Sequence, residues 1–204
     1  MMSLRDCFGP SKKEIWKKLC NEIEATFVDG GFWGGDKVVA KVNKWAVTLD
    51  TYTVSTGRIS ITYTRMRAPY VNKDGFQFKF YRKSIFSDLG KLFGMQDIEV
   101  GIPFFDEKYI VQGNNIQKVK EFFSNTRIYE LVKMQPDIYF KVKDDEGIFG
   151  LEFPRGVDEL YLEVVGVIKD IERLKSLFEL FSEIMNQLCL MGSAYQDNPG
   201  VELK

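Results

Sequence analysis

The stretch WAVTLDTYTVSTGRISITYTRM, at residues 45–66 of this 204-residue chain, decides the fold class. Apolar and polar side chains alternate along both halves of the stretch, and β-branched and aromatic residues dominate it. Such alternation is typical of strands that bury one face. Residues 55–57 suit a three-residue hairpin loop with glycine at its left-handed position, and this loop predicts that Leu49 lies opposite Tyr63.

This register sorts the hairpin into an apolar face and a polar face. Lys79 and Tyr81, from a strand expected at residues 76–81, extend the polar face on an adjoining strand. Such groups can hydrogen-bond a polar ligand or partner, although the solvated surface of an antiparallel sheet has the same composition. The hairpin's own contribution to the polar face is Thr48, Asp50, Tyr52, Ser60, Thr62 and Thr64.

Elements on either side of the hairpin complete the fold class. Residues 37–42 and 76–81 repeat the alternation and predict further strands of an antiparallel meander. Ser11 begins a helix with a capping box, and Asp170 caps a long helix whose apolar stripe continues to Gly192. We therefore predict an α+β fold in which an antiparallel sheet, a meander, is covered by helices, including an N-terminal helix and a long C-terminal helix.

Composition favours one compact domain. Hydrophobic residues make up 45% of the chain and charged residues 28%, which is ordinary for a globular protein. No composition shift, repeat or long linker marks a boundary. The sequence predicts a disordered leader at residues 1–10, a single α+β domain at 11–192 and a loosely ordered tail at 193–204.

The residue types that the chain lacks exclude several functions. It has no histidine, which removes Ser-His-Asp and Cys-His catalysis and histidine metal ligands. Its three cysteines are scattered, as expected of reduced thiols in the cytoplasm. The formal net charge of -1 gives no general attraction for nucleic acid, and no apolar stretch is long enough to span a membrane. We expect a cytoplasmic protein whose partner is neither a nucleic acid nor a membrane.

A glycine-rich segment at residues 29–36 is a second candidate site. Its backbone could admit a ligand on which the ring of Trp33 stacks, with Asp36 at the end of the segment. The alternative is a helix stop followed by a turn, with the aromatic side chains folded onto the core.

Two charged clusters give weaker candidates. Arg58, Arg65 and Arg67 form a small anion patch or pack against the aromatic residues of their strands. Residues 144–146 are acidic but lack the alternating carboxylates of a calcium loop, which favours an exposed hairpin tip.

Several strings in the sequence resemble those of a family of uncharacterised bacterial proteins. The strings are Gly31-Phe32-Trp33, TLDTYT at 48–53, FSDLGKLFG at 86–94 and FDEKY at 105–109. The similarity runs through most of the chain, and none of the strings is a catalytic motif. Because the family has no established activity, substrate or catalytic residues, the resemblance implies no function.

Two functions remain open. The first is a non-enzymatic ligand- or protein-binding module that uses the polar sheet face or an internal apolar pocket. The second is a carboxylate-dependent hydrolase, with or without a metal, in which Asp50 acts with Tyr52 and Lys79. We assign no catalytic residue, metal ligand or cofactor, and the expected partner is an unknown small molecule, a protein or a second copy of the chain. The candidate ligand-binding residues are Trp33, Asp36, Asp50, Tyr52, Thr62, Lys79 and Tyr81.

Overall fold

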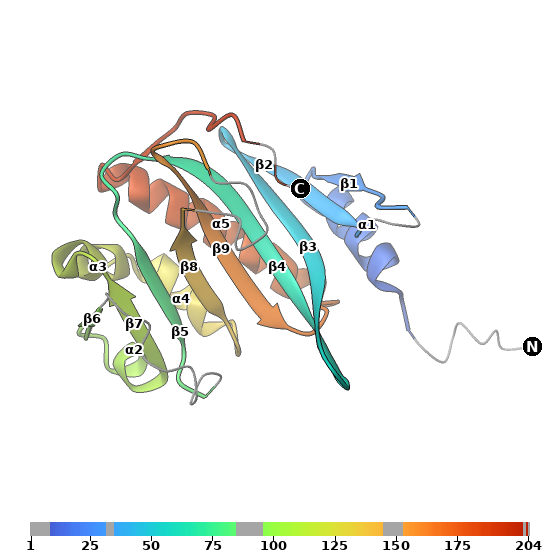
Figure 1. Ribbon diagram of the computed structural model, residues 1–204, viewed down its shortest axis with the longest axis horizontal. Helices are drawn as coiled ribbons and strands as arrows, with labels where there is room; N and C mark the ends of the chain where they lie inside the picture. Colours follow the sequence, from blue (N-terminus) through green and yellow to red (C-terminus); the bar gives the residue numbers. More distant parts are fainter. Residues whose placement is uncertain (1–8, 32–34, 85–95, 145–152, 202, 204) are drawn as a thin grey trace, which may run out of the picture.

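In the computed structural model, which describes residues 9–31, 35–84, 96–144, 153–201 and 203, helices cover one face of a twisted antiparallel sheet (Figure 1). The predicted α+β class is therefore confirmed. The helices are α1 (Lys12–Glu22), α2 (Pro103–Lys108), α3 (Ile116–Phe123), α4 (Thr126–Lys133) and α5 (Ile171–Leu190). The strands are β1 (Thr26–Val28), β2 (Lys37–Val42), β3 (Trp45–Thr56), β4 (Ile59–Asn72), β5 (Phe78–Arg82), β6 (Gln96–Asp97), β7 (Tyr109–Gly113), β8 (Tyr139–Lys143), β9 (Val157–Val165) and β10 (Ala194–Tyr195).

Both terminal helices begin as their sequences predict. The Ser11 side chain accepts a hydrogen bond from the Glu14 backbone N–H, and the Glu14 carboxylate accepts one from the Ser11 N–H at 2.8 Å. Asp170 accepts a hydrogen bond from the backbone N–H of Arg173 at 3.0 Å and so caps α5, which runs for 20 residues. Among the described residues, no helix combines the length and apolarity that crossing a membrane requires.

The strand order departs from a simple meander. The first four strands follow one another, but β9 and β8 lie between β4 and β5, giving the order β1-β2-β3-β4-β9-β8-β5-β7-β6. Short-range periodicity identifies strands but carries no information on which distant strand becomes a neighbour. The tail expected to be loosely ordered begins with β10, which pairs with β4 through Ala194 opposite Asn72.

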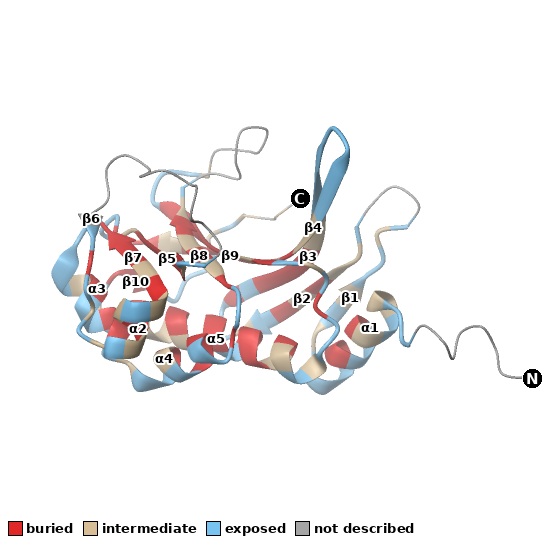
Figure 2. Cartoon of the chain, turned by 90° about the horizontal axis from the view of Figure 1, so that it is seen from below, coloured by how far each residue is buried: buried red, intermediate tan, exposed pale blue. Residues whose placement is uncertain are grey.

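The predicted register of the β3–β4 hairpin is wrong. Its turn has two residues, because Thr56 pairs directly with Ile59, and Leu49 lies opposite Met66 instead of Tyr63. The prediction assumed that the apolar residues of the tip face the core. The tip instead projects beyond the helices, on the side of the sheet away from them, and its apolar side chains are exposed (Figure 2). The observed register differs from the predicted one by an odd number of residues. Such a difference places the side chains of one strand on the opposite face of the sheet.

The core lies between the sheet and the helices and is rich in phenylalanine. Phe80 stacks on Phe140 of the neighbouring strand at a centroid distance of 5.0 Å, and Phe123 of α3 meets Phe80 edge-on at 5.5 Å. The long helix α5 closes this layer through Phe181, whose ring centroid lies 6.0 Å from that of Phe140. Because the helices bury one face of the sheet, most of the charged side chains of the central strands lie on the other face.

Candidate functional site

Two rows of polar side chains cross the face of the sheet that lies opposite the described helices. Residues that pair directly across antiparallel strands point to the same face, so the strand registers place the members of each row side by side. One row is Thr48, Arg67, Tyr161, Lys141, Lys79 and Gln112, on β3, β4, β9, β8, β5 and β7. The next row is Asp50, Arg65, Glu163, Tyr139 and Tyr81. With their neighbours Tyr52, Lys143 and Glu159, we call these two rows the polar face.

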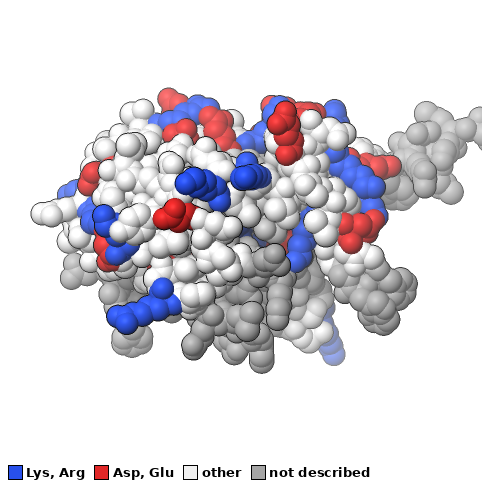
Figure 3. All heavy atoms as spheres, turned by 90° about the horizontal axis from the view of Figure 1, so that it is seen from above, with Lys and Arg blue, Asp and Glu red and all other residues white. Residues whose placement is uncertain are grey.

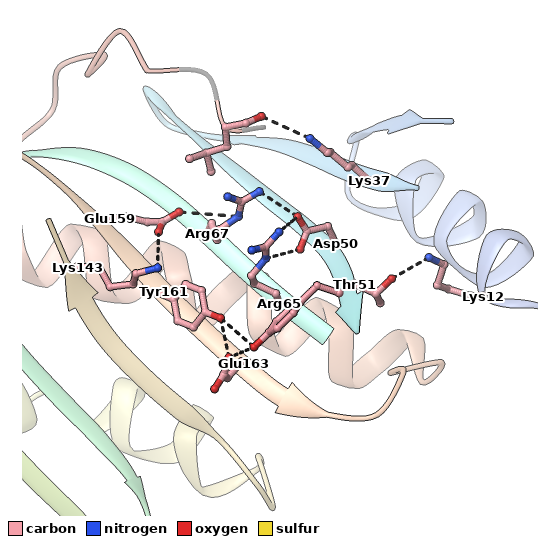
Figure 4. A network of polar contacts seen from close by, with 12 residues as sticks. Lys12, Lys37, Asp50, Thr51, Arg65, Arg67, Lys143, Glu159, Tyr161 and Glu163 are labelled. Atoms are coloured by element: carbon pink, nitrogen blue, oxygen red, sulfur yellow. Dashed lines mark hydrogen bonds and ion pairs between the residues drawn. The ribbon is translucent and has the colours of Figure 1, made fainter. Parts of the chain in front are cut away.

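Asp50 accepts hydrogen bonds from two arginines of the polar face (Figure 4). The Arg65 guanidinium donates to both of its oxygens, each at 2.7 Å, and Arg67 donates to one of them at 3.0 Å. The Asp50 side chain is only 4% exposed. Burial works to lower the pKa of Arg65, but the hydrogen bonds and charge of Asp50 outweigh it and raise that pKa. Both carboxylate oxygens of Asp50 are therefore occupied by protein donors.

A second ion pair continues the network across β9. The Glu159 carboxylate, whose side chain is fully buried, lies 3.9 Å from Nε of Arg67 and 3.7 Å from Nζ of Lys143. Lys143 also lies over the ring of Tyr161, 4.3 Å from its centroid. Four charged groups on four adjacent strands, Asp50 on β3, Arg67 on β4, Glu159 on β9 and Lys143 on β8, thus form one chain of alternating sign.

Glu163, farther along the same face of β9, accepts hydrogen bonds from two tyrosine hydroxyls. Tyr161 donates to it at 2.6 Å, Tyr52 donates to the same oxygen, and the two hydroxyls lie 3.3 Å apart. Burial, followed by the nearby Glu163 charge, raises the pKa of Tyr161 well above its ordinary value. Burial and the hydrogen bond to Glu163 also raise the pKa of Tyr52. Both hydroxyls consequently stay protonated at neutral pH and act as donors.

The far end of the polar face contains a buried lysine and a buried amide. Lys79 is 7% exposed, and burial lowers the pKa of its amine despite the opposing charge of Asp97. Gln112, directly opposite Lys79, donates from Nε2 to Asp97 at 2.5 Å, whereas its buried Oε1 has no hydrogen-bond partner in the described part of the chain. A hollow of about 360 Å³ borders this end at Asp97 and Ile110.

The structure separates the predicted site residues into three groups. Asp50, Tyr52, Lys79 and Tyr81 share the polar face, as their expected alternation requires. The placement of Thr62 beside them is wrong, because the two-residue turn puts it opposite Thr53, and the two hydroxyls share a hydrogen bond of 2.9 Å on the other face of the sheet.

The glycine-rich segment contributes nothing to the polar face that the structure describes. Asp36 accepts a hydrogen bond from the Gly30 backbone N–H at 3.4 Å and lies 4.0 Å from Nζ of Lys12 on α1. It therefore ties the segment to the N-terminal helix. Trp33 lies outside the described residues.

Three acidic and phenolic residues of β9 were missed in the sequence. Glu159, Tyr161 and Glu163 alternate there with Leu160, Leu162 and Val164, which are buried on the opposite face. This period of two identifies a strand with one polar face. Its neighbours were not predictable, because β9 pairs with β4, about 90 residues earlier in the chain.

The arrangement does not assemble the predicted hydrolase centre. Both oxygens of Asp50 accept from arginines, and Tyr52 donates to Glu163 instead of Asp50. Lys79 lies four strands away from the strand of Asp50, which corresponds to about 19 Å at the usual strand spacing. Within the described residues, no three histidine, cysteine, aspartate or glutamate side chains are grouped so that they would hold a metal ion.

Charge is balanced elsewhere on the surface as well. On the side of the molecule shown in Figure 3, the described basic and acidic side chains lie close to one another, without a large region of one sign. Together with the formal net charge of -1, this distribution gives that side no general attraction for a charged partner.

Comparison with known proteins shows a likeness of fold. No protein-family model and no curated sequence matches the chain. The solved structure of the mycobacterial trehalose monomycolate transport factor A, TtfA, is similar with a TM-score of 0.54 and 7% sequence identity, over 94% of this chain and 98% of that one. The expected resemblance to bacterial proteins is thus supported at the level of the fold, and the particular family of uncharacterised proteins is not.

Proposed function

We propose that this chain is a non-enzymatic binding module and that its polar face binds a small, hydroxyl-rich ligand. The observation that carries the proposal is the burial of several ionic and phenolic groups together at the centre of the sheet, on the face opposite the described helices. Four strands, β3, β4, β9 and β8, contribute the connected part of this network.

Stability alone is a poor explanation for such a network. Removing charges from water costs several kcal/mol per ion, and well-packed apolar residues in place of a buried ion pair are often equally or more stable. The opposite face of the same strands shows that this sheet packs well with apolar residues, since Leu160 and Leu162 are fully buried there. A surface for recognition accounts for polar groups at this position.

The available groups match a ligand with many hydroxyls. Arg65 has N–H donors beyond the two that bind Asp50, the two tyrosine oxygens can still accept, and Glu163 receives both tyrosines on one carboxylate oxygen, so a ligand hydroxyl meets both donors and acceptors. Tyrosine rings add flat apolar contact surface, because Tyr52 stacks on Tyr63 at 5.1 Å and Tyr81 lies 5.8 Å from Tyr139. Tyr52, Tyr139, Glu163 and Arg65 are only partly buried, which leaves them within reach of a ligand.

The likeness to TtfA supports the same class of ligand. That protein is described as a trehalose monomycolate transport factor, and trehalose is a hydroxyl-rich sugar. The two proteins share a fold, and the residues of the polar face independently favour a hydroxyl-rich ligand.

Trehalose itself is a suitable first probe. Titration into the ¹⁵N-labelled protein should shift amide signals of β3, β4, β8 and β9 in a saturable manner. Tyr52→Phe should weaken this binding about fivefold, as loss of one neutral hydrogen bond of about 1 kcal/mol does. Tyr129→Phe, on the helix side of the sheet, is the matched control. If the signals never saturate, or if both variants bind as the unchanged protein does, the proposal is wrong.

We also propose that the chain self-associates through the tip of the β3–β4 hairpin. Val54, Ile59 and Ile61 share one face of the tip and are 44%, 62% and 40% exposed. Between residues 53 and 61 the two strands pair only with each other among the described residues, so their outer edges are unpaired. An apolar face with free strand edges favours contact with the same face of a second copy.

A further inference from the structure

The side chain of Gln112, on β7, has one satisfied end and one unsatisfied end. It is 5% exposed, and its Nε2 donates to Asp97 at 2.5 Å. Its Oε1 is buried and accepts no hydrogen bond from the residues that the structure describes. Because a buried amide oxygen has given up its hydrogen bonds to water, folded proteins rarely leave one without a donor. This oxygen therefore marks a place where a ligand can donate a hydrogen bond.

Lys79, directly opposite Gln112 on β5, supplies the complementary chemistry. Its amine is a donor only, whereas the oxygen of Gln112 is an acceptor only. Burial lowers the pKa of the amine, and the charge of Asp97 opposes this shift. Because a carboxylate already lies near the ammonium, the place calls for no further negative charge. A hydroxyl, which donates and accepts at once, is the neutral group that fits between Lys79 and Gln112.

A second place with donors and acceptors for hydroxyls lies farther along the same row. Tyr161 belongs to this row, and its hydroxyl contacts Glu163 at 2.6 Å and the hydroxyl of Tyr52 at 3.3 Å. From the strand of Tyr161 to that of Gln112 the order is β9, β8, β5 and β7, three strand spacings or about 14 Å. One sugar ring is too short to reach both places, whereas a chain of sugars is long enough.

Aromatic rings line the sheet between these two places. In the adjoining row, Tyr139 on β8 is partly exposed, and Tyr81 on β5 lies beside it with ring centroids 5.8 Å apart. Flat rings give apolar surface on which the C–H faces of sugars can pack while the sugar hydroxyls make hydrogen bonds. The hollow of about 360 Å³ at Asp97 and Ile110 leaves room for a further unit at the far end.

We infer that the ligand of the polar face is an oligosaccharide, which lies across the strands from Tyr161 to Gln112 with one hydroxyl between Lys79 and Gln112. The inference rests on the proposed function and adds a length and a direction to it. Trehalose, with its two rings, covers only the end at Tyr161. A longer chain gains the hydrogen bonds of the end at Gln112 as well.

Linear chains of glucose, from maltose to maltohexaose, test this length requirement. Each chain is titrated into the ¹⁵N-labelled full-length protein. We expect maltose to shift amides of β3 and β9, and the longer chains to shift amides of β5 and β7 as well. From maltose to maltohexaose the affinity should rise at least fivefold, because one added neutral hydrogen bond contributes a factor of about this size.

Gln112→Leu removes the unpartnered oxygen from the far end. The variant should bind maltohexaose about fivefold more weakly and should bind maltose at β3 and β9 as the unchanged protein does. Gln117→Leu, the same substitution at an exposed position of α3, is the matched control and should change neither affinity. Thermal unfolding shows whether Gln112→Leu is folded. If it is not, the dependence on chain length in the unchanged protein decides the inference.

The outcomes separate this inference from the proposed function. If trehalose or maltose binds and the longer chains bind no more tightly, the oligosaccharide is wrong while the binding module stands. The same holds if folded Gln112→Leu binds maltohexaose as tightly as Gln117→Leu does. Tighter binding of the longer chains that Gln112→Leu weakens supports both. If no sugar binds the unchanged protein, both are overturned.

Discussion

Arg65 lies directly opposite Asp50 across the β3–β4 pair, and its Nε and one terminal nitrogen each donate to a different oxygen of that carboxylate at 2.7 Å. This two-pronged bond is possible only when both side chains point to the same face. A slip of one residue between the strands would place Arg65 on the helix side and leave Asp50 without it. The pair therefore fixes the hairpin register as well as building the polar face.

The first prediction concerns this pair. Asp50→Asn should lower the free energy of unfolding by about 3 kcal/mol, because two arginines keep their charge in a buried place after their shared carboxylate is gone. Urea unfolding at neutral pH measures the change. Asp29→Asn removes a carboxylate from the exposed pair with Lys13 and should leave the urea midpoint almost unchanged. A similar, small effect of both substitutions would show that the Asp50 network contributes little to the fold.

Much of the fold was predictable because its signals are local. The capping residues Ser11 and Asp170 mark where two helices begin, and strict alternation identified the strands that bring Asp50 and Lys79 to one face. Thr62 failed for a physical reason. At the hairpin tip, apolar residues such as Ile59 are exposed and therefore do not mark the buried face of the strands. The prediction assumed that they do, and it gave the wrong register.

The ionic partners of the site were beyond prediction for a different reason. Arg67 meets Glu159, and Tyr52 meets Glu163, only because β9 inserts beside β4. Each of these contacts joins residues about 90 or more positions apart, and no local preference encodes such a pairing. The sequence predicted the polar groups of the hairpin. Their partners on β9 follow only from the tertiary fold.

The second prediction is a loss of stability in alkali that depends on buried tyrosines. Burial, followed by the charge of Glu163, raises the pKa of Tyr139 to about 12. Because the native state holds this proton more tightly than the unfolded chain, its stabilising contribution is complete below pH 10 and is lost as the pH rises through about 12.

Comparison with Tyr139→Phe measures this contribution. Between pH 9 and pH 11.5, the unfolding free energy of the unchanged protein should fall more than that of the variant, by on the order of 2 kcal/mol. The control is Phe27→Leu, which changes a partly buried ring that carries no ionisable group, and for which the fall should match that of the unchanged protein. Parallel curves for Tyr139→Phe and the unchanged protein would contradict the prediction.

The third prediction concerns the cost of Lys79. Burial lowers the pKa of this amine below its value in the unfolded chain, so the native state disfavours the charged form at every pH below the native pKa. Lys79→Met should therefore raise the unfolding free energy of the ligand-free protein at pH 7 by about 1 kcal/mol. This difference in unfolding free energy between Lys79→Met and the unchanged protein should shrink as the pH approaches 10.5, where the amine of the unfolded chain also loses its proton. A variant less stable than the unchanged protein at pH 7 would show that the lysine already has a favourable partner.

The last prediction tests self-association through the hairpin tip. Ile59→Thr combined with Ile61→Thr removes most of the apolar surface of the tip while keeping β-branched residues that suit a strand. Because both side chains are exposed, the substitutions should shift the thermal midpoint little, whereas sedimentation velocity should show a smaller share of dimer at the same concentration. Val28→Thr, which removes a side chain 43% exposed on the edge strand β1, is the matched control and should leave the share of dimer unchanged. A protein that is monomeric at every concentration before any substitution would rule the hairpin contact out, and equal effects of both substitutions would show that general apolar exposure, and not the tip, drives association.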